Sequence, residues 1–356
     1  MAERFAELKH HPAVRTIGII LIAAALVALP FAIDAALGRA WVRIIDVALL
    51  FIMLALGLNI VVGYAGLLDL GYVAFFAVGA YCYALLASPQ FDIHTSFLLL
   101  LPLGALTAAL FGVLLGAPTL KLRGDYLAIV TLGFGEIIRI FLNNLNRPFN
   151  ITNGPQGITL IDPLAIGGVA LNKTYVIGGI ELAPVHSYYF VFLLCALLIV
   201  IVSLRLENSR IGRAWIAIRE DEAAARAMGI NTRDIKLLAF AMGATFGGIS
   251  GGLFAAFQGF ISPESFTLLD SFMILCMVVL GGMGNVPGVV LGAVLLTALP
   301  EALRYVGPLQ KEWFGQVFID PSDLRMLLFG LALVLMMLFR PAGLWPSKIR
   351  KREWTT

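Results

Sequence analysis

Long apolar runs recur along the chain and are separated by short polar or glycine-rich segments. A helix that crosses a bilayer needs about 20 mostly apolar residues. By this criterion the sequence predicts ten spans, two of them weak because one is short and one carries charges. The ten cover residues 16–33, 44–62, 70–87, 97–117, 126–142, 187–204, 236–258, 270–281, 288–303 and 324–340. We therefore expect an all-α, polytopic transmembrane protein with a single domain over residues 1–356.

The composition supports a membrane protein. Hydrophobic residues make up 60% of the chain and charged residues only 13%, whereas an average soluble domain has about 25% charged residues. No stretch is polar enough to form a separate soluble domain. The first apolar run follows the basic residues Arg4, Lys9 and Arg15 and lacks a cleavage site, so it is predicted to be a signal anchor.

The distribution of Lys and Arg predicts the orientation of the spans. Cytoplasmic loops of membrane proteins carry an excess of these residues. With the N-terminus inside, the segments 1–15, 118–125, 205–236 and 340–356 hold 17 of the 25 basic residues. We expect a multi-pass protein of the bacterial inner membrane with both termini cytoplasmic. The net charge of +3 is too small to indicate a nucleic-acid partner.

The longest predicted outer loop covers residues 143–186 and contains only two basic residues, Arg147 and Lys173. It has turn signals such as Asn153-Gly154-Pro155 and short β-forming stretches such as Tyr175–Ile177. Because a disordered linker is usually more polar and charged, we expect an ordered periplasmic cap here.

Two glycine-rich breaks join apolar runs with almost no loop between them. One lies between the second and third spans, and the other lies between the eighth and ninth. Broken segments in two corresponding halves indicate an internal pseudo-repeat around a transport pathway, and the alternative is two tight turns that need glycine. Asp69 either caps the next helix or lines such a pathway. The candidate pathway or helix-break residues are Gly63, Gly66, Asp69, Gly71, Glu136, Gly281, Gly284 and Gly288.

Glu136 is in this set because it lies within a predicted span. Arg139 is three residues further on and shares its helix face. Charges inside a span normally face protein or a polar cavity. The pair is interpreted either as a structural ion pair near the outer end of the span or as part of the pathway.

The basic loop 205–236 holds the strongest local signal. Asp221 can cap a short helix from Glu222 to Met228, Gly229 can end it, and Arg226 can pair with Glu222. A two-turn helix is marginal alone and needs a surface to dock on. The segment is either a solvated loop or a helix that fits a groove of a cytoplasmic motor, and its alanine-rich, glycine-ended sequence favours the motor. The candidate ATPase-coupling residues are Arg219, Glu220, Asp221, Glu222, Ala223, Ala224, Arg226, Gly229 and Asn231.

Several enzyme and cofactor motifs are absent from the sequence. It contains no GxxxxGK[ST], HExxH, GxSxG or paired CxxC. Cys82, Cys195 and Cys276 lie in apolar runs and are expected to act as small hydrophobic residues. The sequence therefore predicts no catalytic residues, no metal site and no cofactor in this chain. Gly243, Gly247 and Gly251 recur at a spacing of four and predict a helix–helix seam.

Four motifs together resemble the LivM-type permeases of branched-chain amino acid ABC importers. They lie at Gly63–Tyr81, Arg123–Gly133, Thr152–Gly157 and Val279–Gly284, and the stretch Arg219–Gly229 also fits. The resemblance implies a permease that pairs with a second, homologous permease subunit. It also implies two cytoplasmic ATPase subunits that bind ATP, and a periplasmic binding protein that delivers leucine, isoleucine or valine.

The resemblance maps the motor-docking segment onto Glu220–Asn231. The general importer motif has EAA, three residues and then glycine, whereas here four residues separate Ala224 from Gly229. This departure concerns the helix register, and the docking role stays the expectation. Transport by alternating access is the predicted mechanism. The alternatives are a permease for urea or short-chain amides and a passive channel; the lack of clustered His, Asp or Cys residues disfavours a membrane enzyme.

Overall fold

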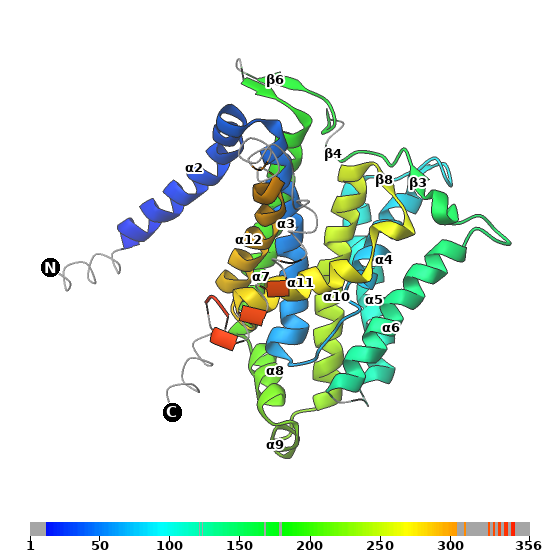
Figure 1. The fold of residues 1–356 in the computed structure, drawn as a ribbon, viewed down its shortest axis with the longest axis vertical. Helices are drawn as coiled ribbons and strands as arrows, with labels where there is room; N and C mark the ends of the chain where they lie inside the picture. Colours follow the sequence, from blue (N-terminus) through cyan, green and yellow to red (C-terminus); the bar gives the residue numbers. More distant parts are fainter. Residues whose placement is uncertain are drawn as a thin grey trace.

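Most of the described chain in this computed structural model is helical, and the long helices run between two ends of the molecule (Figure 1). The structure describes residues 12–304, except 121, 123, 167, 168, 178 and 179, and scattered positions between 310 and 345. Each of the first nine predicted spans corresponds to a helix in this part of the chain, and the tenth, 324–340, lies largely outside it. These helices are α2 (Pro12–Leu37), α3 (Arg39–Leu58), α4 (Val73–Leu86), α5 (Phe97–Thr119), α6 (Asp125–Asn144), α7 (Pro184–Glu207), α10 (Thr232–Gln258), α11 (Leu268–Gly281) and α12 (Val286–Arg304).

Seven helical segments within the described residues are long and apolar enough to cross a bilayer. The helix α4 has 14 residues, which is shorter than the roughly 20 that a full span needs. Large apolar side chains such as Leu98, Leu106 and Leu110 of α5 point outward and are exposed. A water-soluble protein would bury such side chains, whereas lipid solvates them. The prediction of an all-helical, polytopic membrane protein is confirmed.

The helix α10 lies at the centre of the bundle and packs on α3, α4 and α5. Its glycines let the neighbouring backbones approach closely. A methyl group added at Gly248 would lie 2.5 Å from the carbonyl oxygen of Gly104, and one at Gly243 would lie 2.9 Å from that of Gly57. Glycine is therefore required for this packing. The predicted seam through Gly243, Gly247 and Gly251 is confirmed.

One end of the molecule carries short antiparallel strands. Strand β3 pairs with β8 through Ile158↔Ile261 and Thr159↔Phe260, which fastens the 143–186 segment to the link after α10. The predicted β-stretch Tyr175–Ile177 forms strand β6. The strands are β1 (Ala87–Ser88), β2 (Ile93–His94), β3 (Ile158–Thr159), β4 (Ala165–Ile166), β5 (Val169–Ala170), β6 (Tyr175–Ile177), β7 (Ile180–Leu182) and β8 (Phe260–Ile261), with short 3-10 turns η2 (Gly154–Gln156) and η3 (Pro263–Ser265).

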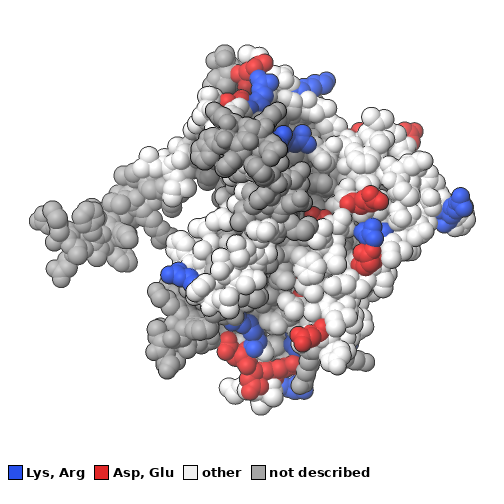
Figure 2. All heavy atoms as spheres, in the orientation of Figure 1, with Lys and Arg blue, Asp and Glu red and all other residues white. Residues whose placement is uncertain are grey.

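The opposite end carries the connection between α7 and α10, at the bottom of Figure 1. Here the sequence analysis expected one short helix, and the structure has two, α8 (Arg210–Glu220) and α9 (Glu222–Ala227). Figure 2 shows many of the charged atoms of this view toward the two ends, with a smaller group at mid-height over α6. This distribution is typical of a protein whose middle lies in lipid.

Candidate functional site

The helix α8 begins at a hydroxyl cap and is held by a buried tryptophan. The Ser209 hydroxyl accepts a hydrogen bond from the Gly212 amide at 3.0 Å, which satisfies a free donor at the helix start. Trp215 is fully buried, and its indole N–H donates to the Ile235 carbonyl at 2.7 Å. The helix is thereby fixed to the first turn of α10. We name α8, α9 and the start of α10, residues 209–236, the elbow.

The helix α9 has the ends that the sequence predicts. The Asp221 carboxylate accepts hydrogen bonds from the Ala223 and Ala224 amides at 2.8 and 3.0 Å. Gly229 follows the helix with φ of +86°, a left-handed conformation that glycine adopts without a steric penalty. The turn then closes as the Ile230 amide donates to the Ala225 carbonyl. The predicted cap, helix and glycine end are all present.

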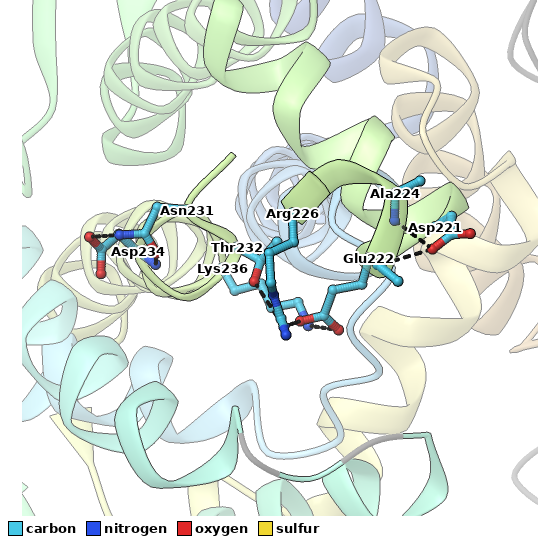
Figure 3. Close-up of polar contacts among 9 residues, drawn as sticks. Asp221, Glu222, Ala224, Arg226, Asn231, Thr232, Asp234 and Lys236 are labelled. Atoms are coloured by element: carbon cyan, nitrogen blue, oxygen red, sulfur yellow. Dashed lines mark hydrogen bonds and ion pairs between the residues drawn. The ribbon is translucent and has the colours of Figure 1, made fainter. Parts of the chain in front are cut away.

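An ion-pair cluster fastens α9 to α10, and its residues converge in Figure 3. Glu222 bonds Arg226 at 3.1 Å and Lys236 at 2.7 Å. The Lys236 side chain is only 10% exposed, and Glu222 is the counter-ion of this nearly buried side chain. The hydrogen bond from Lys236, together with its charge and that of Arg226, lowers the pKa of Glu222. Next to the cluster, Asn231 accepts from the Asp234 amide at 3.4 Å and caps α10.

The tip of the elbow is apolar although it faces outward. Met228 is 84% exposed, and Ala223, Ala224 and Ala227 are exposed beside it. Ala225 on the opposite side of α9 is buried. Glu220, between α8 and the cap residue Asp221, is also exposed. Exposed apolar groups at an end that carries charge are typical of a surface that binds another protein.

The two glycine breaks meet each other beneath the elbow. The chain after α3 continues as a π-helix, η1 (Asn59–Tyr64), a form often found at functional sites. The Asn59 side-chain oxygen accepts a hydrogen bond from the Gly284 amide at 2.8 Å. A methyl group added at Gly63 would lie 2.6 Å from the Gly284 nitrogen. Two segments more than 200 residues apart are therefore in direct contact.

Arg219, in the last turn of α8, reaches this contact. Its guanidinium donates to the Gly63 carbonyl at 2.6 Å. Gly66 has φ of +68°, and a methyl group there would lie 2.6 Å from Cγ of Arg219. Gly284 also has positive φ, of +80°. We name Asn59, Gly63, Gly66, Arg219 and Gly284 the junction.

The remaining break residues lie in other places. Gly281 and Gly288 face each other across the α11–α12 turn, where an added methyl group on Gly288 would lie 2.9 Å from the Trp345 carbonyl. Asp69 accepts a hydrogen bond from the Gly71 amide at 2.9 Å, and Gly71 packs on the backbone of Thr131 in α6. Asp69 was expected either to cap the next helix or to line a pathway; α4 begins at Val73, and the residue before it makes no side-chain capping hydrogen bond.

Glu136 and Arg139 form the predicted ion pair on α6. Arg139 donates from Nε to Oε1 of Glu136 at 3.0 Å, and a second, shorter contact joins Nη2 to the same oxygen. Glu264 of η3 adds a negative charge nearby. Both side chains of the pair are partly exposed on a helix face that is otherwise apolar. This pair is separate from the elbow and the junction.

Sequence reasoning did not assign Asn59, Trp215, Met228 or Lys236 to the site. Asn59 is a lone amide in an apolar run, which is a usable signal. The exposure of Met228 and the burial of Lys236 depend on the fold and carry no such signal. In the described part of the chain, no group of three His, Cys, Asp or Glu residues is arranged to hold a metal ion.

Comparison with known proteins identifies similar chains. The family described as "Branched-chain amino acid transport system / permease component" matches residues 40–337. The Escherichia coli permease protein LivM of a high-affinity branched-chain amino acid transport system is 44% identical over 90% of this chain and 72% of its own length. A probable LivM of Methanocaldococcus jannaschii is 31% identical over 70% of this chain and 69% of its own length. The permease protein LivH of Escherichia coli is 25% identical, over 71% and 81%. No solved structure matches the chain.

Proposed function

Because the chain belongs to the permease family of branched-chain amino acid ABC transport systems, we propose that it carries leucine, isoleucine and valine by alternating access, driven by ATPase subunits that dock on the elbow. As a permease component it is a transport subunit and not an enzyme. It is a multi-pass membrane protein, and the similarity to both LivM and LivH chains implies a paired permease.

The proposed assembly has five protein subunits. This chain pairs with a second, homologous permease, and two cytoplasmic ATPase subunits bind the ATP. A periplasmic binding protein delivers the amino acid to the end that carries the 143–186 segment. The 205–236 segment then lies on the cytoplasmic side with both termini, in the bacterial inner membrane. The charge bias of the loops supports this orientation.

The single observation that carries the coupling proposal is the exposed apolar tip of the elbow. Met228 and the exposed alanines beside it form an apolar surface that a partner protein can cover. The cap of α9 and the ion pair between Glu222 and Lys236 of α10 hold this tip in a fixed position. A rigid two-helix projection can transmit force, whereas a flexible loop would absorb it.

We assign the pathway to the broken helices and to the charged pair on α6. Gly63, Gly66, Asp69, Gly71, Gly281, Gly284 and Gly288 supply irregular backbone, which a membrane protein tolerates only where protein or water satisfies it. Glu136 lies on a partly exposed face beside Arg139. A facing permease would shield these charges from lipid.

The test is co-purification of the complete complex with variants at Met228. Burial of a methionine side chain contributes about 1.5–3 kcal/mol, so Met228→Glu is expected to weaken ATPase binding about tenfold or more. Met228→Leu keeps the apolar volume and is the matched control. Wild-type recovery of ATPase subunits with Met228→Glu would contradict docking at this tip. Amino acid flux through the wild-type complex in proteoliposomes without ATP would indicate a passive channel instead.

A further inference from the structure

We infer that Arg219 is the positioning residue that links movement of the elbow to both broken helices at once. The inference rests on the proposed docking of ATPase subunits at the elbow. It adds the contacts through which a displacement of the elbow would move the membrane-spanning helices. It is carried by the junction geometry, in which a side chain from α8 bonds the first break and the first break bonds the second, far away in the sequence.

The first link is between α8 and the end of the α3–η1 helix. The last carbonyl groups of any helix have no partner within the helix, and the end of the helix carries partial negative charge. The Gly63 carbonyl is one of these groups, and the Arg219 guanidinium donates to it at 2.6 Å. A charge-assisted hydrogen bond of this length is among the stronger polar contacts in a protein.

The second link is between the two breaks. The Gly284 amide bonds the Asn59 side chain at 2.8 Å, and a methyl group added at Gly284 would lie 3.6 Å from the Arg219 guanidinium. The close approach of Gly63 to Gly284 leaves no room for the two segments to slide past each other. Displacement of the Gly63 carbonyl therefore displaces the turn between α11 and α12.

Arg219 lies at the point of the elbow where movement of α9 would displace its side chain. It lies two residues before Asp221, the cap of α9, at the point where α8 passes into α9. Trp215, one turn earlier, holds α8 to α10. Movement of the α9 tip about this fixed turn is transmitted to the Arg219 side chain. Arg219 thus connects the docking surface to η1 and, through η1, to the second break.

A purely structural helix cap would make the same hydrogen bond, so the test needs a readout that separates the two roles. We choose the ratio of amino acid transported to ATP hydrolysed, measured in proteoliposomes with the complete complex and loaded binding protein. Loss of a cap lowers assembly and both activities together. Loss of transmission lowers transport while ATP hydrolysis continues.

The variants are Arg219→Gln, Arg219→Lys and the control Arg304→Gln. Arg304 lies in the last turn of α12, pairs with Glu301 at 3.2 Å with a side chain that is 75% exposed, and belongs to neither the elbow nor the junction. With Arg219→Gln we expect transport to fall about tenfold or more while ATP hydrolysis changes less than about twofold. Arg219→Lys keeps the cation and should restore much of the ratio, and Arg304→Gln should match wild type.

Three results would overturn the inference. They are an unchanged ratio in Arg219→Gln, a parallel fall of both activities, and an equal fall in ratio for Arg304→Gln. If Arg219→Gln does not assemble, Asn59→Ala is the second test. It leaves Arg219 intact and removes the hydrogen bond between Asn59 and the Gly284 amide. A wild-type transport-to-hydrolysis ratio in Asn59→Ala would also overturn the inference. A wild-type complex without any ATP-dependent uptake would instead refute the proposed function.

Discussion

Glu222 is expected to determine the stability of α9, because it joins this helix to α10. The helix has six residues, too few to be stable alone. It is held to α10 by the bond from Glu222 to Lys236 at 2.7 Å. Glu222→Gln removes the charge and leaves a nearly isosteric side chain. Lys236 then keeps a positive charge in a site that is only 10% exposed.

The free-energy cost of Glu222→Gln is expected to lie between the values for a buried and for an exposed ion pair. Breaking a fully buried ion pair costs about 3–5 kcal/mol, and breaking an exposed pair costs about 0–1 kcal/mol. The side chain of Glu222 is 25% exposed and that of Lys236 is 10% exposed. We therefore expect about 2 kcal/mol, which corresponds to a roughly 30-fold greater population of the opened α9.

Hydrogen exchange measures this opening directly. The amides of Ala225, Met228 and Ile230 donate within the α9 turn, so their protection reports on its stability. The matched control is Arg226→Gln, which breaks the other ion pair of Glu222 at a side chain that is 63% exposed. That change should cost less than about 1 kcal/mol. Equal protection in Glu222→Gln and wild type, or equal losses in both variants, would refute the reasoning.

The contact between Glu222 and Lys236 makes the stability of α9 depend on pH. Hydrogen bonding and charge from Lys236, with a further contribution from Arg226, lower the pKa of Glu222 from its ordinary value of 4.5. A lowered pKa means that the carboxylate stabilises the fold fully above about pH 4.5 and that this contribution is lost as the pH falls through the lowered pKa. Protection of α9, corrected for intrinsic exchange, should fall in that acidic range in wild type. Glu222→Gln should lack this step.

Two further predictions concern other parts of the molecule. Gly248→Ala places a methyl group 2.5 Å from the Gly104 carbonyl oxygen and should destabilise the protein by about 1–3 kcal/mol or more, seen as a lower Tm in detergent. Gly133→Ala, which meets open space inside α6, is the control and should not lower Tm, because alanine favours a helix over glycine. The hydrogen bond that His94 donates to the Asp162 carboxylate raises the pKa of His94 above 6.5, so their ion pair is complete below that pH and is lost as the pH rises through the raised pKa. Proteolysis of the 87–96 segment should therefore increase with pH, and it should show no such step in His94→Gln.

The spans were predictable because the bilayer imposes a simple rule on sequence. Each helix in lipid needs a continuous apolar run, and such runs were visible directly. The predicted span 97–117 became Phe97–Thr119, and 187–204 became Pro184–Glu207. Errors of a few residues arose at the ends, where polar residues such as Asn208 and Ser209 continue or cap the helix beyond the apolar run.

The helix α8 was missed because it is amphipathic rather than apolar. Arginines alternate with apolar residues, and only one face, with Trp215 and Ile218, is buried. The signal was present in the sequence, since Ile211, Trp215 and Ile218 follow a helical spacing after Ser209, a favourable cap residue. The arginines of this segment are equally compatible with a basic loop, so the charge alone does not distinguish the two.

The junction lay beyond the reach of sequence reasoning for a different reason. Arg219 and Gly63 are 156 positions apart, and neither residue type specifies the other, since any arginine can bond any free carbonyl. What selects this pair is the packing of α3 and α12 against each other, which brings the second break beside the first. The glycines at both breaks were identified as special from their spacing alone, yet the spacing cannot distinguish a turn from a contact between two turns. Arg219 can act on both glycine breaks only because the fold places them in contact. The coupling role inferred for Arg219 therefore depends on the tertiary structure and not on its local motif.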